Sequence, residues 1–209
     1  MKKILIADDH SAIRNGVKLI LTSEFHDVEF GEATNSNEIF KKLKEKKWDL
    51  LILDMNMPGR NGLEVLKQLK EEKSSVKVLM FSMHPEDQIA LRAFRTGASG
   101  YLSKDTADTQ LIIAVNQILN GKKYITPEMA EQMVAQLENP TDKLPHELLS
   151  NREYQTLLLI ASGKTISQIA EELSLSVPTI STYRARILEK MNFKNSAELT
   201  HYSLSNHLV

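Results

Sequence analysis

The first 120 residues alternate short apolar runs with longer amphipathic segments. The runs are rich in Val, Ile, Leu and Phe, as strands are, and in the segments between them the apolar residues recur three and four positions apart, as in a helix. Strands that alternate with helices are typical of a parallel sheet covered by helices on both faces. The predicted strands are Lys3–Ala7, Val28–Glu32, Leu50–Leu53, Val76–Phe81 and Ser99–Leu102. The predicted helices are Ala12–Thr22, Asn37–Lys46, Leu63–Glu71, Pro85–Thr96 and Thr109–Asn120.

From Ser150 onward the apolar pattern is helical only, which predicts a separate all-helical domain of about 60 residues. Ser150 and Glu153 have the spacing of a capping box, and Gly163 ends the helix that they begin. A short turn at 174–176 joins the second and third helices, which predicts a helix-turn-helix. The second helix carries Ile166, Ile169, Ala170 and Leu173. The third follows the N-cap Ser176 and has Pro178 in its first turn. The fourth spans Ala197–Leu208.

The segment between the two patterns contains Asn139-Pro140-Thr141-Asp142-Lys143-Leu144-Pro145, where prolines and turn formers interrupt regular structure. We therefore expect an α/β domain at 1–121 with a five-stranded doubly wound parallel sheet of the flavodoxin-like kind. A linker at 122–146 follows, with a helix at Pro127–Leu137. The four-helix helix-turn-helix domain occupies 147–209.

Composition narrows the class of protein only slightly. Apolar residues make up 42% and charged residues 25% of the 209 positions, which is ordinary for a globular protein. Lys and Arg total 26 against 27 Asp and Glu, and there is no cysteine for disulfides or thiolate chemistry. The apolar N-terminal run stops at two carboxylates, and no stretch approaches the roughly 20 apolar residues of a membrane span. We expect a cytoplasmic protein with no membrane partner.

Three acidic residues fall at predicted strand ends, with Asp8 and Asp9 after the first strand and Asp54 after the third. Carboxyl ends of parallel strands share one edge of a sheet, so these carboxylates can converge, and oxygen ligands together with water favour Mg²⁺. Ser82 and Lys104 end the fourth and fifth strands at the same edge. Such a set can bind a phosphoryl group, with Asp54 as the nucleophile. A single Asp before Met-Asn-Met-Pro-Gly is more often a turn residue, but five groups at the right strand ends are improbable by chance.

The motifs at these strand ends resemble those of the two-component receiver domain over residues 1 to about 120. They are Ile-Ala-Asp-Asp-His, Leu-Asp-Met-Asn-Met-Pro-Gly-Arg-Asn-Gly, Phe-Ser and Gly-Tyr-Leu-Ser-Lys. The resemblance implies that Asp54 accepts phosphate from the phosphohistidine of a sensor histidine kinase. It also implies that Asp9, Asp54 and the backbone carbonyl of Asn56 hold Mg²⁺.

Further roles follow from the same resemblance. Asp8 would bind the metal through water, and Lys104 would pair with the phosphoryl group. Ser82 would be the switch hydroxyl, and Tyr101 the aromatic side chain whose rotamer follows it. Receivers commonly have a proline in a cis peptide after the lysine, whereas Asp105 follows here. Because a cis bond before a non-proline residue costs about 2.5–4 kcal/mol, the geometry of this bond is left open.

The helical domain resembles the LuxR-type helix-turn-helix, so the whole chain has the layout of NarL/FixJ response regulators. This resemblance rests on Ser150-Asn151-Arg152-Glu153, Ile169-Ala170-Glu171-Glu172-Leu173 and Ser176-Val177-Pro178-Thr179-Ile180. Similarity to the GacA-like members rests on Tyr183-Arg184-Ala185-Arg186-Ile187 and Glu198-Leu199-Thr200-His201. It implies double-stranded DNA as a partner, a homodimer formed on phosphorylation or DNA binding, and RNA polymerase as a further candidate partner.

The third helix of this domain, 177–191, is the expected DNA-binding helix. Its apolar face predicts Ile180, Ile187 and Met191 in the core. Small outward residues can then approach base edges in the major groove: Ser181, Thr182 and Ala185, with Glu189 farther along. Thr179, Arg186 and Lys190 suit phosphates, whereas Arg184 lies nearer the apolar side. Family members often have Lys at the positions of Pro178 and Ser181, so we expect a different sequence specificity.

Two alternatives remain beside a phosphorylation-controlled transcription regulator. A receiver-like domain that no longer takes phosphate would leave DNA binding always on, and the intact acidic set with Ser82 and Lys104 argues against it. An aspartyl-phosphate phosphatase would use a second Asp two residues after the nucleophile as its general acid and base. Asn56 occupies that position and cannot transfer a proton, which disfavours an enzyme.

Overall fold

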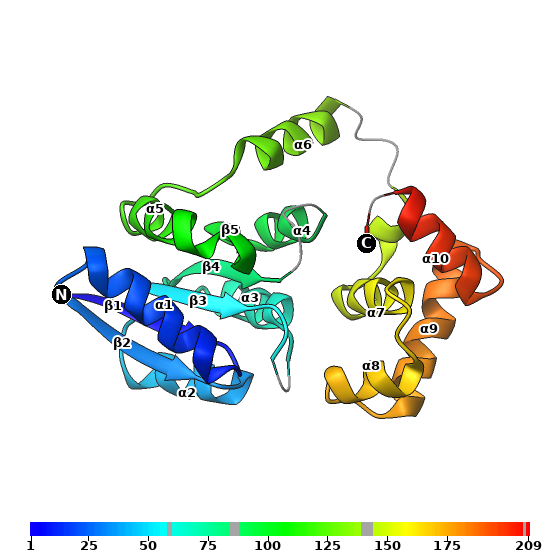
Figure 1. The fold of residues 1–209 in the computed structure, drawn as a ribbon, viewed down its shortest axis with the longest axis horizontal. Coiled ribbons are helices and arrows are strands. Elements are labelled where there is room, and N and C mark those ends of the chain that lie inside the picture. Colours follow the sequence, from blue (N-terminus) through cyan, green and yellow to red (C-terminus); the bar gives the residue numbers. More distant parts are fainter. Residues whose placement is uncertain (58–59, 84–87, 139–143, 207) are drawn as a thin grey trace. The chain divides into compact units, whose positions relative to one another are not determined.

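The computed structural model describes residues 1–57, 60–83, 88–138, 144–206 and 208–209, and the helix expected from Pro85 begins partly outside these ranges. The chain divides into two compact units, Met1–Val134 and Ala135–Val209, which are described separately. The first unit is an α/β domain, and the second contains helices only in its described part (Figure 1). The predicted fold class is therefore confirmed.

A five-stranded parallel sheet with the order β2-β1-β3-β4-β5 forms the centre of the first unit (Figure 1). Side chains alternate between its two faces, because successive residues of a strand point in opposite directions. Ile4 and Ile52 belong to the core on one face, while their neighbours Leu5 and Leu51 are equally buried on the other. Both faces are thus covered, as in doubly wound folds. The strands are β1 Lys2–Ala7, β2 Val28–Ala33, β3 Leu50–Asp54, β4 Lys77–Ser82 and β5 Gly100–Ser103.

Helices α1 and α5 contact each other and share the core cluster that contains Val17, Leu21, Leu111 and Ile118. Helices α3 and α4 contact each other, and α2 packs against β2. Sequence patterns placed these helices to within a few residues at each end. Their bounds are α1 Ser11–Glu24, α2 Ser36–Glu45, α3 Gly62–Glu71, α4 Gln88–Thr96 and α5 Ala107–Leu119, with the 3₁₀ turn η1 Lys104–Thr106 before α5.

The first unit continues beyond α5. Gly121 takes a φ of 83°, a left-handed conformation, and the chain returns to the edge of the sheet, where Tyr124 forms a parallel bridge with Gly100. A Cβ atom at Gly100 would lie 2.8 Å from Cδ1 of Ile118, so a larger residue there would have to displace the end of that side chain. Helix α6, Pro127–Glu138, follows. The expected boundaries at 121 and 146 stay predictions.

The second unit consists of η2 Pro145–Leu148, α7 Asn151–Ala161, α8 Ile166–Glu172, α9 Val177–Met191 and α10 Ser196–Ser205. Helix α7 contacts α8, α9 and α10. The capping box of Ser150 and Glu153 is confirmed, and Ser176 caps α9 by accepting a hydrogen bond from the backbone N–H of Thr179. Helix α10 ends at Ser205, three residues before the predicted end.

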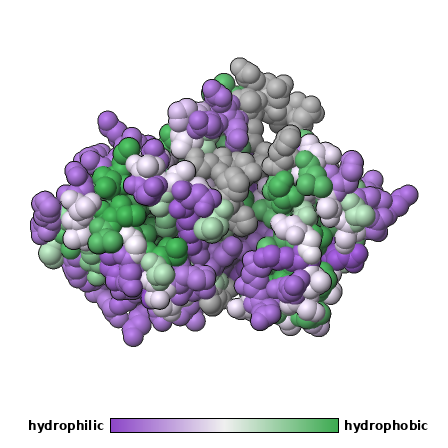
Figure 2. Space-filling model, viewed as in Figure 1, coloured by the Kyte–Doolittle hydropathy of each residue, from purple (hydrophilic) through white to green (hydrophobic). Residues whose placement is uncertain are grey.

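Polar side chains dominate the visible surface of each unit, with apolar residues scattered among them (Figure 2). Scattered apolar residues are normal on a protein surface. Within the described ranges, no helix combines the length and the apolar content that crossing a bilayer requires.

Candidate functional site

The carboxyl ends of four strands bring the predicted acidic and switch residues to one edge of the sheet. The strand register pairs Ala7 with Leu53 and Asp54 with Phe81, so the residue after β1 and the last residue of β3 lie on adjacent strands. Ser82 ends β4 opposite Ser103, and Lys104 directly follows β5. This edge is where α/β sheets bind ligands.

Lys104 lies between two carboxylates at this edge. Its Nζ is 2.7 Å from Oδ2 of Asp8 and 2.9 Å from Oδ1 of Asp54. The side chains are buried, with exposed fractions of 8% for Lys104, 1% for Asp8 and 5% for Asp54. Removing Lys104 would leave two buried carboxylates without their shared cation, so the three side chains act as a unit.

Burial has opposite consequences for the two kinds of group. Burial, with a smaller contribution from the nearby Asp8, raises the pKa of Asp54 to about 6 despite the attraction of Lys104. The backbone N–H of Asn56 donates to Asp54 and, like Lys104, limits this rise. Burial alone would lower the pKa of Lys104, but Asp54 and Asp8 outweigh it and raise that pKa above its ordinary value. Lys104 therefore stays protonated and Asp54 is ionised above about pH 6.

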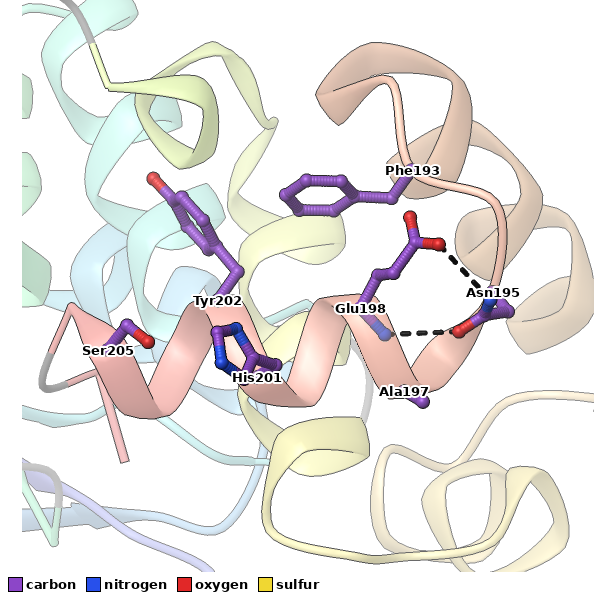
Figure 3. A pocket seen from close by; sticks show the side chains of 7 residues that line it. All are labelled: Phe193, Asn195, Ala197, Glu198, His201, Tyr202 and Ser205. Atoms are coloured by element: carbon purple, nitrogen blue, oxygen red, sulfur yellow. Dashed lines mark hydrogen bonds between the residues drawn. The ribbon is translucent and has the colours of Figure 1, made fainter.

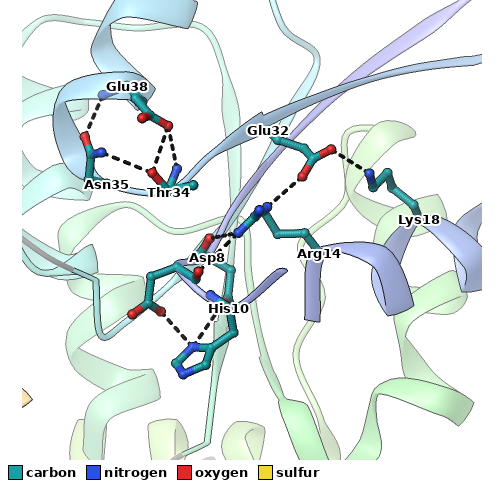
Figure 4. Close-up of polar contacts among 9 residues, drawn as sticks. Asp8, His10, Arg14, Lys18, Glu32, Thr34, Asn35 and Glu38 are labelled. Atoms are coloured by element: carbon teal, nitrogen blue, oxygen red, sulfur yellow. Dashed lines mark hydrogen bonds and ion pairs between the residues drawn. The ribbon is translucent and has the colours of Figure 1, made fainter. Parts of the chain in front are cut away.

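Asp8, Asp9 and His10 each place one potential ligand atom within 4.8 Å of the others. With Asp54 and the carbonyl of Asn56, the residues here offer mainly carboxylate and carbonyl oxygens, which fit Mg²⁺. His10 was not anticipated from the sequence. Its Nδ1 lies 2.8 Å from Oδ1 of Asp9, and its backbone N–H donates to Oδ1 of Asp8 at 2.8 Å (Figure 4). A histidine directly after an acidic pair was the available signal.

The two predicted switch residues are both inside the first unit. Ser82 is 1% exposed and Tyr101 is fully buried on β5, in register with Met80. The described residues include no cis peptide bond, so the bond between Lys104 and Asp105 is trans. The hydroxyl of Ser103 instead caps η1 by accepting from the backbone N–H of Asp105 at 3.3 Å.

Helix α9 presents the outward face that its periodicity predicted. Ile180, Ile187 and Met191 are buried, as expected. The residues assigned to base edges are exposed, namely Ser181, Thr182 and Ala185. Two of those assigned to phosphates, Arg186 and Lys190, are exposed as well. Thr179 and Arg184 are half-buried.

Several of these side chains already have partners within the domain. Lys190 pairs with the buried Glu153 of α7 at 2.7 Å, a contact that the sequence did not indicate. Arg184 donates from Nε to the hydroxyl of Ser196 at 2.7 Å. Neither a hydrogen bond nor an ion pair is found for Arg186 in the described part of the chain, so its charge is available to an outside partner.

A pocket beside α10 was also not anticipated (Figure 3). Asn195 caps α10 by accepting from the backbone N–H of Glu198 at 3.1 Å. The rings of Phe193 and Tyr202 lie with centroids 5.4 Å apart, and the Tyr202 hydroxyl is 2.8 Å from Nδ1 of the buried His146. The contact between His146 and Tyr202 connects η2 with α10. The pocket is lined by Phe193, Asn195, Ala197, Glu198, His201, Tyr202 and Ser205.

Comparison with known proteins identifies both parts of the chain. The model of the response regulator receiver domain matches residues 4–116, and that of the bacterial regulatory proteins of the luxR family matches 147–203. Response regulator UvrY of Escherichia coli (strain K12) is 33% identical over 209 residues, which are 100% of this chain and 96% of that protein. Response regulator GacA of Pseudomonas syringae pv. syringae (strain B728a) is 31% identical over 210 residues, covering 100% and 98%.

Among solved structures, RcsB from Salmonella enterica serovar Typhimurium bound to promoter P1flhDC, in the presence of the phosphomimetic BeF3⁻, has a TM-score of 0.60. It is 25% identical, and the alignment covers 96% of this chain and 97% of that one. The predicted family is confirmed. The chain belongs to the NarL/FixJ-type response regulators, a group that includes the GacA-like proteins and whose members join a receiver domain to a LuxR-family DNA-binding domain.

Proposed function

We propose that this response regulator accepts phosphate on Asp54 from a sensor histidine kinase and controls transcription by binding DNA through α9. The observation that carries the proposal is the placement of Lys104 against both Asp8 and Asp54 at the carboxyl edge of the sheet. A buried carboxylate beside a fixed cation is a nucleophile whose product, an acyl phosphate, has a positive partner in place.

In the transfer step, an oxygen of Asp54 bonds to phosphorus while the bond from phosphorus to the histidine nitrogen breaks. The nitrogen keeps the bonding electron pair, and Lys104 pairs with the phosphoryl oxygens. Asp8, Asp9, Asp54 and the carbonyl of Asn56 would hold Mg²⁺, which supplies charge neutralisation for the phosphoryl group. Asn56 offers no proton for catalysed hydrolysis, so we propose a regulator rather than an enzyme.

Phosphorylation then acts as a population shift. The phosphoryl group gives the Ser82 hydroxyl a new acceptor, and movement of Ser82 changes the space beside Tyr101. We propose that the surface of β4, α4 and β5 responds and favours a homodimer. A dimer suits DNA because helix-turn-helix proteins bind paired half-sites. Such a regulator acts where the DNA is, in the cytoplasm, and RNA polymerase is a candidate partner there.

On DNA, we propose that Ser181, Thr182 and Ala185 face base edges and that Arg186 and Thr179 contact phosphates. The hydroxyl of Thr182 donates to the carbonyl of Pro178 at 2.9 Å, so its proton is already used within the helix and this side chain offers DNA no donor. Arg184 and Lys190, which bond within the domain, would be auxiliary contacts.

Arg186→Ala and Thr182→Ala should separate the two kinds of contact. Loss of Arg186 removes a phosphate cation, so affinity falls on every sequence and the slope of log K against log salt shrinks by about one. Loss of Thr182 should cost about 1–3 kcal/mol on the preferred site only and leave the slope unchanged. Fluorescence anisotropy across a salt series measures both.

The matched control is Thr22→Ala, because Thr22 is an exposed helical threonine in the other unit with the same hydroxyl bond to the carbonyl four residues back. It should leave DNA binding unchanged. An Arg186→Ala variant that changed the preferred base pair, with Thr182→Ala neutral, would mean that α9 faces the DNA with a different side.

The proposal as a whole is tested by selecting genomic fragments with the full chain, with and without a small-molecule phosphodonor and Mg²⁺. We expect enrichment of a discrete set of fragments that increases with phosphodonor. Light scattering should show a dimer under the same conditions. Equal enrichment and equal mass in both conditions would contradict phosphorylation control, and no enrichment in either would contradict DNA binding.

A further inference from the structure

A basic residue lies beside the acidic edge, the carboxyl edge of the sheet with Asp8, Asp9 and Asp54, but bonds none of these carboxylates. Arg14, in the first turns of α1, donates from Nη1 to the backbone carbonyl of Asp8 at 2.8 Å and to that of Asp9 at 3.3 Å (Figure 4). Lys104, by contrast, bonds carboxylate oxygens directly. Arg14 therefore holds the main chain of the acidic pair without bonding its side-chain oxygens.

The orientation of Arg14 is itself fixed from β2. Its Nε donates to Oε2 of Glu32 at 2.7 Å, and the other oxygen of Glu32 accepts from Nζ of Lys18 at 2.6 Å (Figure 4). Hydrogen bonds from Lys18 and Arg14 lower the pKa of Glu32, so it stays ionised. The side chain of Arg14 is only 12% exposed, and its planar fork has little freedom.

This arrangement meets a physical requirement of the site. Asp8 and Asp9 are adjacent anions, and Asp8 shares Lys104 with a third, Asp54, so mutual repulsion favours a turn in which the carboxylates spread apart. Arg14 acts as a clamp, because its hydrogen bonds to the two backbone carbonyls oppose that spreading. The negative charge of Glu32 offsets much of the positive charge of Arg14. Second partners of this kind, which orient metal ligands without touching the metal, commonly change metal affinity 10- to 100-fold when removed.

We propose that Arg14, oriented by Glu32, is the positioning residue that sets the affinity of the Asp8–Asp9 turn for a divalent cation. The inference rests on the proposed function, since it concerns the same acidic edge. Positioning and plain electrostatics make opposite predictions here. Arg14 is a cation and by charge alone repels Mg²⁺, so its removal would tighten binding; as a clamp, its removal weakens binding.

The test is titration of Mg²⁺ into the full chain by isothermal calorimetry, with Arg14→Lys and Arg14→Met. Arg14→Lys keeps the charge and loses the fork, so we expect about 10-fold weaker binding, and Arg14→Met should be no tighter. Glu32→Gln should weaken binding in the same direction by a smaller factor. Lys18→Met, which removes only the outer partner of Glu32, is the control and should stay within about twofold.

A second readout separates positioning from damage to the fold. Phosphorylation by a small-molecule phosphodonor should need about 10-fold more Mg²⁺ in Arg14→Lys but reach a rate close to that of the wild type at saturating Mg²⁺. Unchanged or tighter Mg²⁺ binding in both Arg14 variants would overturn the inference, as would a rate at saturation that stayed low. A wild-type chain that bound no Mg²⁺ and took no phosphate would instead overturn the proposed function.

Discussion

Asp54→Asn is expected to abolish phosphorylation of the chain. The amide is almost the same shape as the carboxylate but has no anionic oxygen to bond to phosphorus. It also removes one of the two carboxylates that hold Lys104, so the cation is left with Asp8 alone. Intact mass spectrometry after incubation with a phosphodonor and Mg²⁺ should show the added phosphoryl group in the wild type and none in the variant.

The control is Asp105→Asn, an exposed carboxylate one residue after Lys104. It should leave phosphorylation at the wild-type level, because Asp105 takes part only in the start of η1. A full-rate acyl phosphate on Asp54→Asn would show that another carboxylate, with Asp8 and Asp9 the nearest, is the acceptor.

Much of this site was predictable from the sequence, because regular structure carried it. Hydrophobic periodicity located the strands, and the carboxyl ends of parallel strands share one edge, so Asp8, Asp54 and Lys104 had to lie near one another. Caps were equally predictable where the pattern was local, as at Ser150 with Glu153. These features depend on residues close in sequence or on sheet topology.

What could not be predicted depends on side-chain reach between distant segments. Arg14 and Glu32 are 18 positions apart, and Lys190 and Glu153 are 37 apart. On a helical wheel each of these cations is only a surface charge, and no local pattern reveals that a long side chain finds a particular carboxylate. The assignment of Lys190 to DNA phosphates stays a prediction, and the fold adds an ion pair through which Lys190 joins α9 to α7.

The protonation of Asp54 was also beyond the sequence, since it depends on burial. Its carboxyl pKa is about 6 in the folded chain against an ordinary 3.8, with burial as the largest cause. The folded state therefore binds this proton more tightly than the unfolded state does. Between about pH 4 and pH 6 the stability contributed by the proton is lost as pH rises, and above pH 6 the ionised group destabilises the fold.

Asp54→Asn should consequently raise the free energy of unfolding of the metal-free chain. The pKa difference corresponds to an increase of about 1–3 kcal/mol at pH 8, falling to about 0.5 kcal/mol at pH 4, where Asp54 is still protonated in the folded state and only partly ionised in the unfolded state. Urea denaturation in EDTA at the two pH values measures it.

Mg²⁺ should reverse the order at pH 8, because an ion that binds only the folded wild type stabilises it by mass action. A variant less stable than the wild type in EDTA at pH 8 would mean that Lys104 compensates Asp54 fully. The ionised carboxylate of Asp54 would then not lower the free energy of unfolding. If the variant is more stable, the chain keeps a buried anion at a cost to its own fold, and a bound Mg²⁺ ion offsets that cost.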